Sequence, residues 1–296
     1  MPVNAAPTPN TFLWTLRAAT VATAVLVGLA ISAAGDGRAA GAAVPAAVMW
    51  WVVVAALVVS LVVPGALGLT AVRMCGPLGV VAAGAALVAG TDGAVGAVAL
   101  AAALLTAAVA FAAETGEAMV QGAAYGEERR LPLHMPAAFV LPVALSWLVW
   151  CALVVAAALL LGAHAWVAGG VDAALAVASG YALFQRLQRF SRRWLVVVPA
   201  GLVVHDHVVL AETMMVPTAN VRRCCLAMAD TKAADLTGPA GGHALEVTVG
   251  EMVTPLFAAT RAEPKGRAIH AAAFLIAPSR PGRALHALSD AGLPVT

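Results

Sequence analysis

The sequence predicts an α-helical polytopic membrane domain of six transmembrane helices, followed by a small, mainly β domain closed by one helix. Three observations support this fold class. Apolar residues make up 62% of the 296 and charged residues 11%, against about 45–50% and about 25% in soluble domains. The apolar residues come in blocks long enough to cross a bilayer. After Arg193 these blocks give way to short, Val-rich runs separated by turn residues, as in half-buried strands.

The spans are placed by the apolar blocks and by the polar residues between them. Pro77–Ala113 is a continuous apolar stretch of 37 residues, about 55 Å long as one helix, whereas the hydrocarbon core is roughly 30 Å thick. It must therefore fold back, and "GTDG" at 90–93 is its turn-prone point, so we place the third and fourth spans there. The other spans are Leu13–Ala34, one beginning near Pro45, Ala137–Leu161 and Ala173–Phe184.

Arginines in the short loops predict the orientation, because cytoplasmic loops are enriched in Lys and Arg. With the N-terminus inside, only Arg38 faces outward and eight arginines face the cytoplasm. The abundance of Ala, Val and Gly is typical of a GC-rich bacterial genome. We therefore expect a bacterial inner-membrane protein with both termini cytoplasmic. The eight arginines are Arg17, Arg73, Arg129, Arg130, Arg186, Arg189, Arg192 and Arg193.

Six of these arginines are interpreted as residues of the membrane interface. Four of them end the last apolar block, which divides the chain into a membrane domain, residues 1–190, and a cytoplasmic domain, residues 194–296. Each Lys or Arg near anionic headgroups adds about 1 kcal/mol of attraction to the surface. The six are Arg129, Arg130, Arg186, Arg189, Arg192 and Arg193.

The cytoplasmic domain is expected to contain seven strands and one short amphipathic helix. The helix lies in "PSRPGRALHALSDAGLPV", with Ser279 as its N-cap and Gly292 near its end. Seven short strands in about a hundred residues predict a curved β-sandwich or barrel with one end closed by the helix. The strands are Trp194–Val198, Leu202–Leu210, Thr213–Pro217, Val221–Met228, Leu245–Val249, Val253–Ala259 and Ile269–Ile276.

Two runs of this domain resemble the bacterial pleckstrin-homology-like (PH-like) domains. "LVVVPAGLVVHDHVVLAETMMVPTANVRR" is similar to their turn-glycine hairpin and the strand after it, and "AFLIAPSRPGRALHALSDAGLP" to their last strand, loop and C-terminal helix. The resemblance covers the last third of the chain and is carried by hydrophobic patterns; the insert from Met228 to His243 departs from it. It implies a PH-like fold. The membrane half carries no such resemblance.

Two histidines in the cytoplasmic domain are candidate functional residues. His205 and His207 alternate on one expected strand, so both rings point to one face and Asp206 points to the other. With Cys224 or Cys225 on a neighbouring strand they would form a metal site. We favour the plainer interpretation, a solvated strand face, and predict no metal.

A second pair of candidates is acidic. Glu114 and Glu117 lie three residues apart, on one face if the helix of the fourth span continues. Within the bilayer they would indicate proton or cation passage, or, together with His134, a membrane-embedded enzyme. We favour a solvated helix exit, because the polar trend continues through "GEERRLPLHM", which we interpret as a salt-bridged loop. Glu114, Glu117, His205 and His207 are the candidate polar cluster of the chain.

Several classes of function are disfavoured by the motifs and the charge. No phosphate-binding loop, GxSxG elbow, HExxH or paired CxxC occurs, and a net charge of +2 gives no reason to expect nucleic-acid binding. We predict no catalytic residue and no cofactor. The prediction is a noncatalytic protein whose partners are the lipid bilayer and, through its cytoplasmic domain, a protein or peptide or the lipid surface, in a scaffold or regulatory role.

The alternative is a small-solute or ion transporter with a cytoplasmic regulatory domain. Pro64 and Pro142 break the second and fifth spans, which correspond if the six spans form two sets of three. The sequence leaves the ligand, the partner and homo-oligomerisation open.

Overall fold

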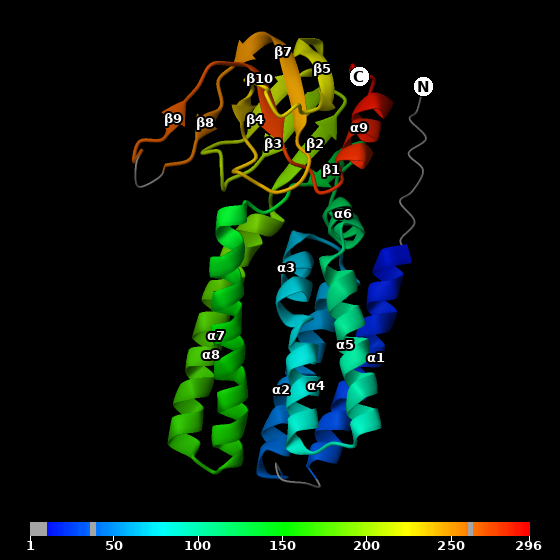
Figure 1. The fold of residues 1–296 in the computed structure, drawn as a ribbon, viewed down its shortest axis with the longest axis vertical. Coiled ribbons are helices and arrows are strands. Elements are labelled where there is room, and N and C mark those ends of the chain that lie inside the picture. Colours follow the sequence, from blue (N-terminus) through cyan, green and yellow to red (C-terminus); the bar gives the residue numbers. More distant parts are fainter. Residues whose placement is uncertain (1–10, 36–39, 260–262) are drawn as a thin grey trace. The chain divides into compact units, whose positions relative to one another are not determined.

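The computed structural model describes residues 11–35, 40–259 and 263–296 and divides into two compact units (Figure 1). A helical unit holds the described residues from Thr11 to Met119 together with Val143–Gln188. A β-rich unit holds Val120–Pro142 together with Arg189–Thr296. Arg38 lies outside the described residues.

Six segments of the described chain are helical, long enough and apolar enough to span a membrane, as predicted. Length and composition are thus those of a multi-pass membrane protein. The helices are α1 Thr11–Ala34, α2 Ala40–Val62, α3 Ala66–Cys75, α4 Leu78–Ala89, α5 Gly93–Phe111, α6 Ala113–Gln121, α7 Ala137–Gly162 and α8 Trp166–Ser191.

The apolar stretch from Pro77 to Ala113 does fold back at the predicted point. Helix α4 ends at Gly90, whose φ of 106° lies in the left-handed region that glycine adopts without strain. Two residues later the carboxylate of Asp92 accepts hydrogen bonds from the N–H groups of Ala94 and Val95 and caps α5. A C-cap glycine and an N-cap aspartate therefore fix the turn.

Three spans begin earlier than we predicted. The second begins at Ala40 and not near Pro45, which lies inside α2. The third runs over Ala66–Ala89 as α3 and α4 together, although we assigned residues 64–77 to the end of the second span. The sixth begins at Trp166, not Ala173, because only residues 163–165 of the segment that we interpreted as a loop separate the two helices. Small and apolar residues on both sides of the true boundaries hid them in the sequence.

Two arginines of the helical unit bind backbone carbonyls at the ends of neighbouring helices. Arg17 donates from Nε and Nη2 to the carbonyl oxygen of Leu61 at 3.2 and 2.8 Å, and Arg73 donates from Nε to that of Ala110 at 3.2 Å. The last carbonyls of a helix have no partner within the helix and carry partial negative charge, which a guanidinium neutralises. These arginines therefore join the ends of α2 and α5 to α1 and α3.

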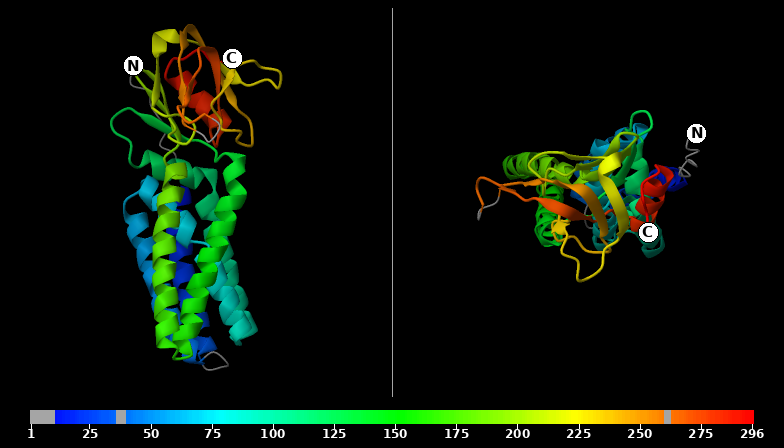
Figure 2. Two further views of the ribbon diagram at one scale, coloured as in Figure 1. Left: turned by 90° about the vertical axis from the view of Figure 1, so that its left-hand side faces the viewer. Right: turned by 90° about the horizontal axis from the view of Figure 1, so that it is seen from above.

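Helices α7 and α8 form a hairpin (Figures 1 and 2). The indole Nε1 of Trp150 donates to the carbonyl oxygen of Ala176 at 3.0 Å, beside Gly180, where a Cβ would lie 2.6 Å from that same nitrogen. A glycine is therefore required at position 180, where α8 approaches the Trp150 side chain of α7. Trp147 of α7 in turn donates from Nε1 to the carbonyl oxygen of Met74 in α3 at 2.9 Å and ties the hairpin to the other helices.

The β-rich unit contains two four-stranded sheets, a two-stranded ribbon and the helix α9, Pro281–Asp290. The sheet orders are β1-β2-β3-β4, β5-β7-β10-β6 and β8-β9, and the ribbon projects from the rest of the unit (Figure 2). The strands are β1 Arg129–Pro132, β2 Trp194–Val198, β3 Gly201–His205, β4 Met214–Pro217, β5 Val221–Leu226, β6 Ala234–Asp235, β7 Leu245–Val253, β8 Leu256–Phe257, β9 Arg267–Ala268 and β10 Ala271–Ile276.

One core is shared by both large sheets and by α9. Leu195 and Leu202 from the first sheet, Phe274 from the second and Leu288 from α9 are completely buried and belong to one hydrophobic cluster. The β-rich region with a closing helix is therefore present as predicted. Ser279 is not the N-cap: Arg280 holds that position, and Pro281 begins the helix.

The strand β1 lies in the segment that we interpreted as a loop. It pairs antiparallel with β2, with Leu131 opposite Leu195 and Pro132 opposite Trp194. Leu131 is only 5% exposed and belongs to the core of the β-rich unit. The unit is thus assembled from two parts of the chain that are separated by α7 and α8, whereas we began the cytoplasmic domain at residue 194.

Candidate functional site

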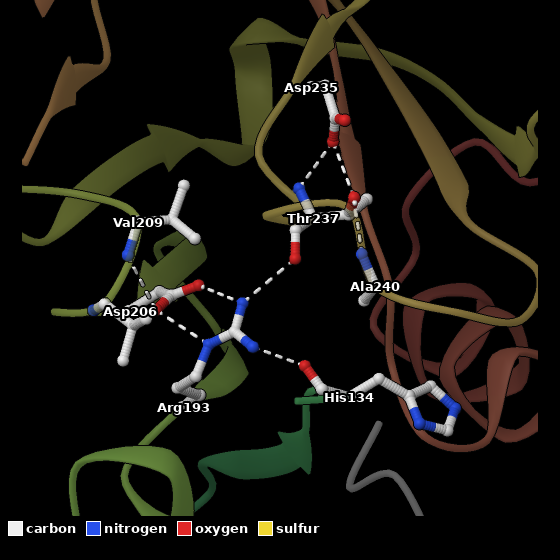
Figure 3. A network of polar contacts seen from close by, with 8 residues as sticks. His134, Arg193, Asp206, Val209, Asp235, Thr237 and Ala240 are labelled. Carbon is white, nitrogen blue, oxygen red and sulfur yellow. Dashed lines mark hydrogen bonds and ion pairs between the residues drawn. The ribbon is translucent and has the colours of Figure 1, made fainter. Parts of the chain in front are cut away.

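The buried polar centre of the β-rich unit is an ion pair between Arg193 and Asp206 (Figure 3). Arg193 Nε lies 2.8 Å from Asp206 Oδ1 and Nη2 lies 2.7 Å from Oδ2, a bidentate arrangement with both side chains at most 1% exposed. Nη2 also donates to the carbonyl oxygen of Thr237 at 3.1 Å, and Nη1 donates to that of His134. One guanidinium thus holds three segments of the chain.

Asp206 also shapes the turn that follows β3. Its Oδ1 accepts from the N–H groups of Val208 and Val209 at 3.0 and 3.3 Å, and its carbonyl oxygen accepts from Leu210 N–H at 2.9 Å. The strand that we extended to Leu210 therefore ends at His205, because this aspartate turns the chain.

The insert between Met228 and His243 is held by the same network. Asp235 Oδ1 accepts from the N–H and the hydroxyl of Thr237 at 2.7 and 2.6 Å, and the Thr237 hydroxyl accepts from Ala240 N–H at 3.3 Å (Figure 3). Leu236 between them is completely buried in the core. The segment that we expected to be a flexible connection is an ordered part of the fold.

The arginines that we assigned to the membrane interface divide into three groups. Arg193 is buried and cannot reach a headgroup, which corrects our assignment. Arg129 and Arg130 lie on β1, where Arg130 forms an ion pair with Glu128 at 2.6 Å. The remaining three, Arg186, Arg189 and Arg192, are exposed on the last turns of α8 and just after it.

The outer face of the first sheet carries a stack of cationic and aromatic side chains, which we call the Trp194 face: Arg130, Trp194, His205 and His207. The Arg130 guanidinium carbon lies 5.3 Å from the centroid of the Trp194 ring. The other neighbour of this ring, His205, stacks on it at 5.1 Å between centroids and an angle of 14°, and His207 meets His205 edge-on at 4.5 Å. The two histidines are therefore neighbours, although β3 ends at His205 and His207 lies in the turn after it, not on the expected strand.

Burial and positive neighbours disfavour protonation of His205. Its Nδ1 lies 3.0 Å from the hydroxyl of Thr213. Burial lowers the pKa of His205 below the usual 6.5, and His207, Arg192 and Arg130 lower it further, although Asp206 acts in the opposite direction. Burial, and then the charge of Arg193, likewise lowers the pKa of His134.

These shifts predict that the β-rich unit loses stability in acid. Because the folded pKa of His205 is below the unfolded value of 6.5, the unfolded chain binds more protons below pH 6.5. The stabilisation is therefore complete above about pH 6.5 and is lost as the pH falls below it. The test is to measure the unfolding midpoint in denaturant between pH 7.5 and pH 5.5. His205→Gln should make this midpoint less dependent on pH. Replacement of the exposed His243 by Gln is the control and should leave the pH dependence unchanged. If the unfolding midpoint changed equally with pH in both variants, the prediction would be contradicted.

The two cysteines do not complete a metal site with the histidines. They lie on β5, whereas the hydrogen-bonded neighbours of β3 are β2 and β4. Burial raises the pKa of Cys224 to about 11, which disfavours the thiolate that binds metal. Within the described residues there is no group of three His, Cys, Asp or Glu side chains placed to hold an ion.

The acidic candidates and the histidines belong to different units of the chain. Glu114 and Glu117 belong to the helical unit, while His134, His205 and His207 belong to the β-rich unit. Both glutamates lie on α6, and Glu117 is buried, at 6% exposure, where we favoured a solvated exit. Beside it, Gly116 lies against Arg73: a Cβ there would be 2.9 Å from Arg73 Nη2.

Sequence reasoning missed Arg193, Asp206 and Thr237 as one network. The available signal was the position of Asp206, on the opposite face of the strand from two histidines, where a core-facing carboxylate requires a cation. Comparisons with protein-family models, curated proteins and solved structures find no match to the chain.

Proposed function

We propose that the protein is a noncatalytic bacterial inner-membrane protein, with both termini in the cytoplasm, whose PH-like β-rich unit binds a protein or peptide partner through the Trp194 face. The observation that carries the proposal is the chemistry of this face. Trp, Arg, Tyr and Met are enriched at protein interfaces, and Trp and Arg supply most of the binding hot spots.

Several contacts make the Trp194 face suitable for a protein rather than for an anionic surface. Glu128 neutralises Arg130 and also accepts from the backbone N–H of Tyr125 at 2.6 Å, and Tyr125 itself is 83% exposed. On β4, Met215 is 49% exposed opposite Val203, which lies on the same face of β3 as His205. An exposed thioether beside aromatic rings, with the charge of Arg130 balanced by Glu128, favours a folded protein or a peptide.

In this proposal the exposed arginines at the end of α8 act on the membrane. Arg186, Arg189 and Arg192 are spaced three residues apart, so they follow one side of the helix. Attraction of about 1 kcal/mol each to anionic headgroups would hold the end of α8 at the interface.

Purification from the native membrane in mild detergent tests the proposal. Trp194→Ala should reduce the amount of a co-purifying partner by about thirtyfold, the effect of a hot spot of about 2 kcal/mol. His207→Ala, on an exposed side chain, should reduce it without affecting the fold. Met252→Ala, in the other sheet and 69% exposed, is the matched control and should leave the partner bound.

One result would overturn the proposal. If the wild-type protein were recovered alone and reconstituted vesicles moved a solute, the transporter alternative would replace it. Hydrogen exchange of the β2 and β3 amides in Trp194→Ala separates loss of binding from loss of the fold.

A further inference from the structure

The helical unit contains a cavity of about 150 Å³ between α1, α2, α4 and α7. Every residue that lines it is apolar, and nine of the nineteen are alanine. Its walls include Trp50 of α2, Ala86 of α4, and Cys151 and Ala158 of α7. Without a charged or hydroxyl side chain the walls offer no ligand to a hard cation or to an anion, and a water would find few partners.

The cavity exists because α7 contacts the other helices at two separate places. At one, Trp147 donates to the carbonyl oxygen of Met74. At the other, about 22 Å further along the helix, a Cβ on Gly162 would lie only 2.5 Å from the Cα of Ala42, so the backbones of α7 and α2 are in contact. The alanines between these contacts are too small to fill the space.

The cavity lies along α4. Its lining residues on α4 run along one face from Leu78 to Ala89, which is about 16 Å of helix. One leaflet of the hydrocarbon core is about 15 Å deep. An apolar cavity of about 150 Å³ is of the size that takes a benzene-sized group, so it admits a segment of one hydrocarbon chain but not a fused ring system.

The cavity communicates with the apolar surface of the spans. Leu159 lines it and is also 56% exposed, and Val88, next to the lining residues of α4, is 85% exposed. In a membrane this surface is in contact with acyl chains. An apolar cavity left vacant forfeits the dispersion contacts of its walls, whereas a hydrocarbon chain restores them.

We propose that this cavity binds one acyl chain of a bilayer phospholipid, with the headgroup remaining outside the bundle. The site is independent of the Trp194 face. The bound chain would act as part of the packing between α7 and α4, in place of larger side chains.

Photo-crosslinking of the full-length protein tests this proposal. The protein is reconstituted in vesicles of phosphatidylethanolamine and phosphatidylglycerol that contain a phosphatidylcholine with a diazirine on one acyl chain, and adducts are mapped by mass spectrometry. We expect adducts on Val154 and Ala158 in the cavity wall, besides those on the outward-facing Leu148 and Val149.

Cavity-filling variants make the result specific. Ala158→Leu should lower the cavity-wall adducts on Val154 by about tenfold, and Ala46→Leu on α2 is a second filling variant should the first not fold. Ala152→Leu, on the exposed side of α7, is the matched control and should leave them unchanged. Adducts confined to Leu148 and Val149 in the wild type, or equal labelling of Val154 in all variants, would overturn the proposal.

Discussion

Replacing Asp206 by Ala is expected to lower the free energy of unfolding of the β-rich unit by about 3–5 kcal/mol, because the buried guanidinium of Arg193 then loses its counter-ion. The side chains of both residues are at most 1% exposed, so water cannot replace the carboxylate without opening the fold. The turn after β3 also loses the acceptor for the N–H groups of Val208 and Val209. The measurement is hydrogen exchange of the β2 and β3 amides in the full-length protein.

Two further variants define the origin of this effect. Arg192→Ala removes an exposed neighbouring arginine and should change the stability by no more than about 0.5 kcal/mol. The double replacement Arg193→Met with Asp206→Leu should recover part of the loss, since no charge remains buried. Recovery is expected to be partial, because the carbonyl oxygens of His134 and Thr237 lose their donor. If Asp206→Ala and Arg192→Ala were equally stable, the ion pair would not hold the unit together.

The second large effect is expected for Leu131→Ala, at about 2–5 kcal/mol. Leu131 reaches the core from β1, which lies between α6 and α7 in the sequence. Its loss leaves a cavity next to Leu195, its partner in the neighbouring strand. The readout is again the protection of the β2 amides, because a detached β1 exposes that edge.

A leucine on the surface of the same unit provides the control. Leu226 on β5 is 49% exposed, so Leu226→Ala makes the same chemical change with an expected cost below about 0.5 kcal/mol. If the β2 amides of Leu131→Ala were as well protected from hydrogen exchange as those of the wild type, β1 would not be an integral part of the unit.

The elements that were predictable from the sequence carry local signals. Apolar blocks of sufficient length yield six spans, and the Gly and Asp of "GTDG" mark the turn between α4 and α5 because they cap two helix ends. The strand β2 was predicted to the residue, since a short Val-rich apolar run begins directly after the arginines and ends at the turn residues "PAG". Each of these signals is contained within one continuous segment of the chain.

The elements that were missed depend on partners distant in sequence. β1 reads "RRLP" and forms a strand only because β2, more than sixty residues later, supplies its hydrogen bonds. Arg193 belongs to a run of arginines whose composition indicates solvent or lipid, and only the tertiary structure separates it from the exposed Arg192. The burial of Glu117 likewise depends on α6 packing within the helical unit rather than on its own polar neighbours.

Because α7 and α8 separate β1 from β2 in the sequence, the first sheet can form only after both helices have been synthesised. The ribosome completes "RRLP" well before it reaches "WLVVV", and two hydrophobic helices must leave the exit tunnel and enter the bilayer in the interval. During that time the nascent edge has no partner, and Leu131 and Leu133 remain in water or with a chaperone. Residues 194–296 expressed alone would have the same exposed edge permanently, so we expect them to aggregate unless residues 129–134 are supplied in trans.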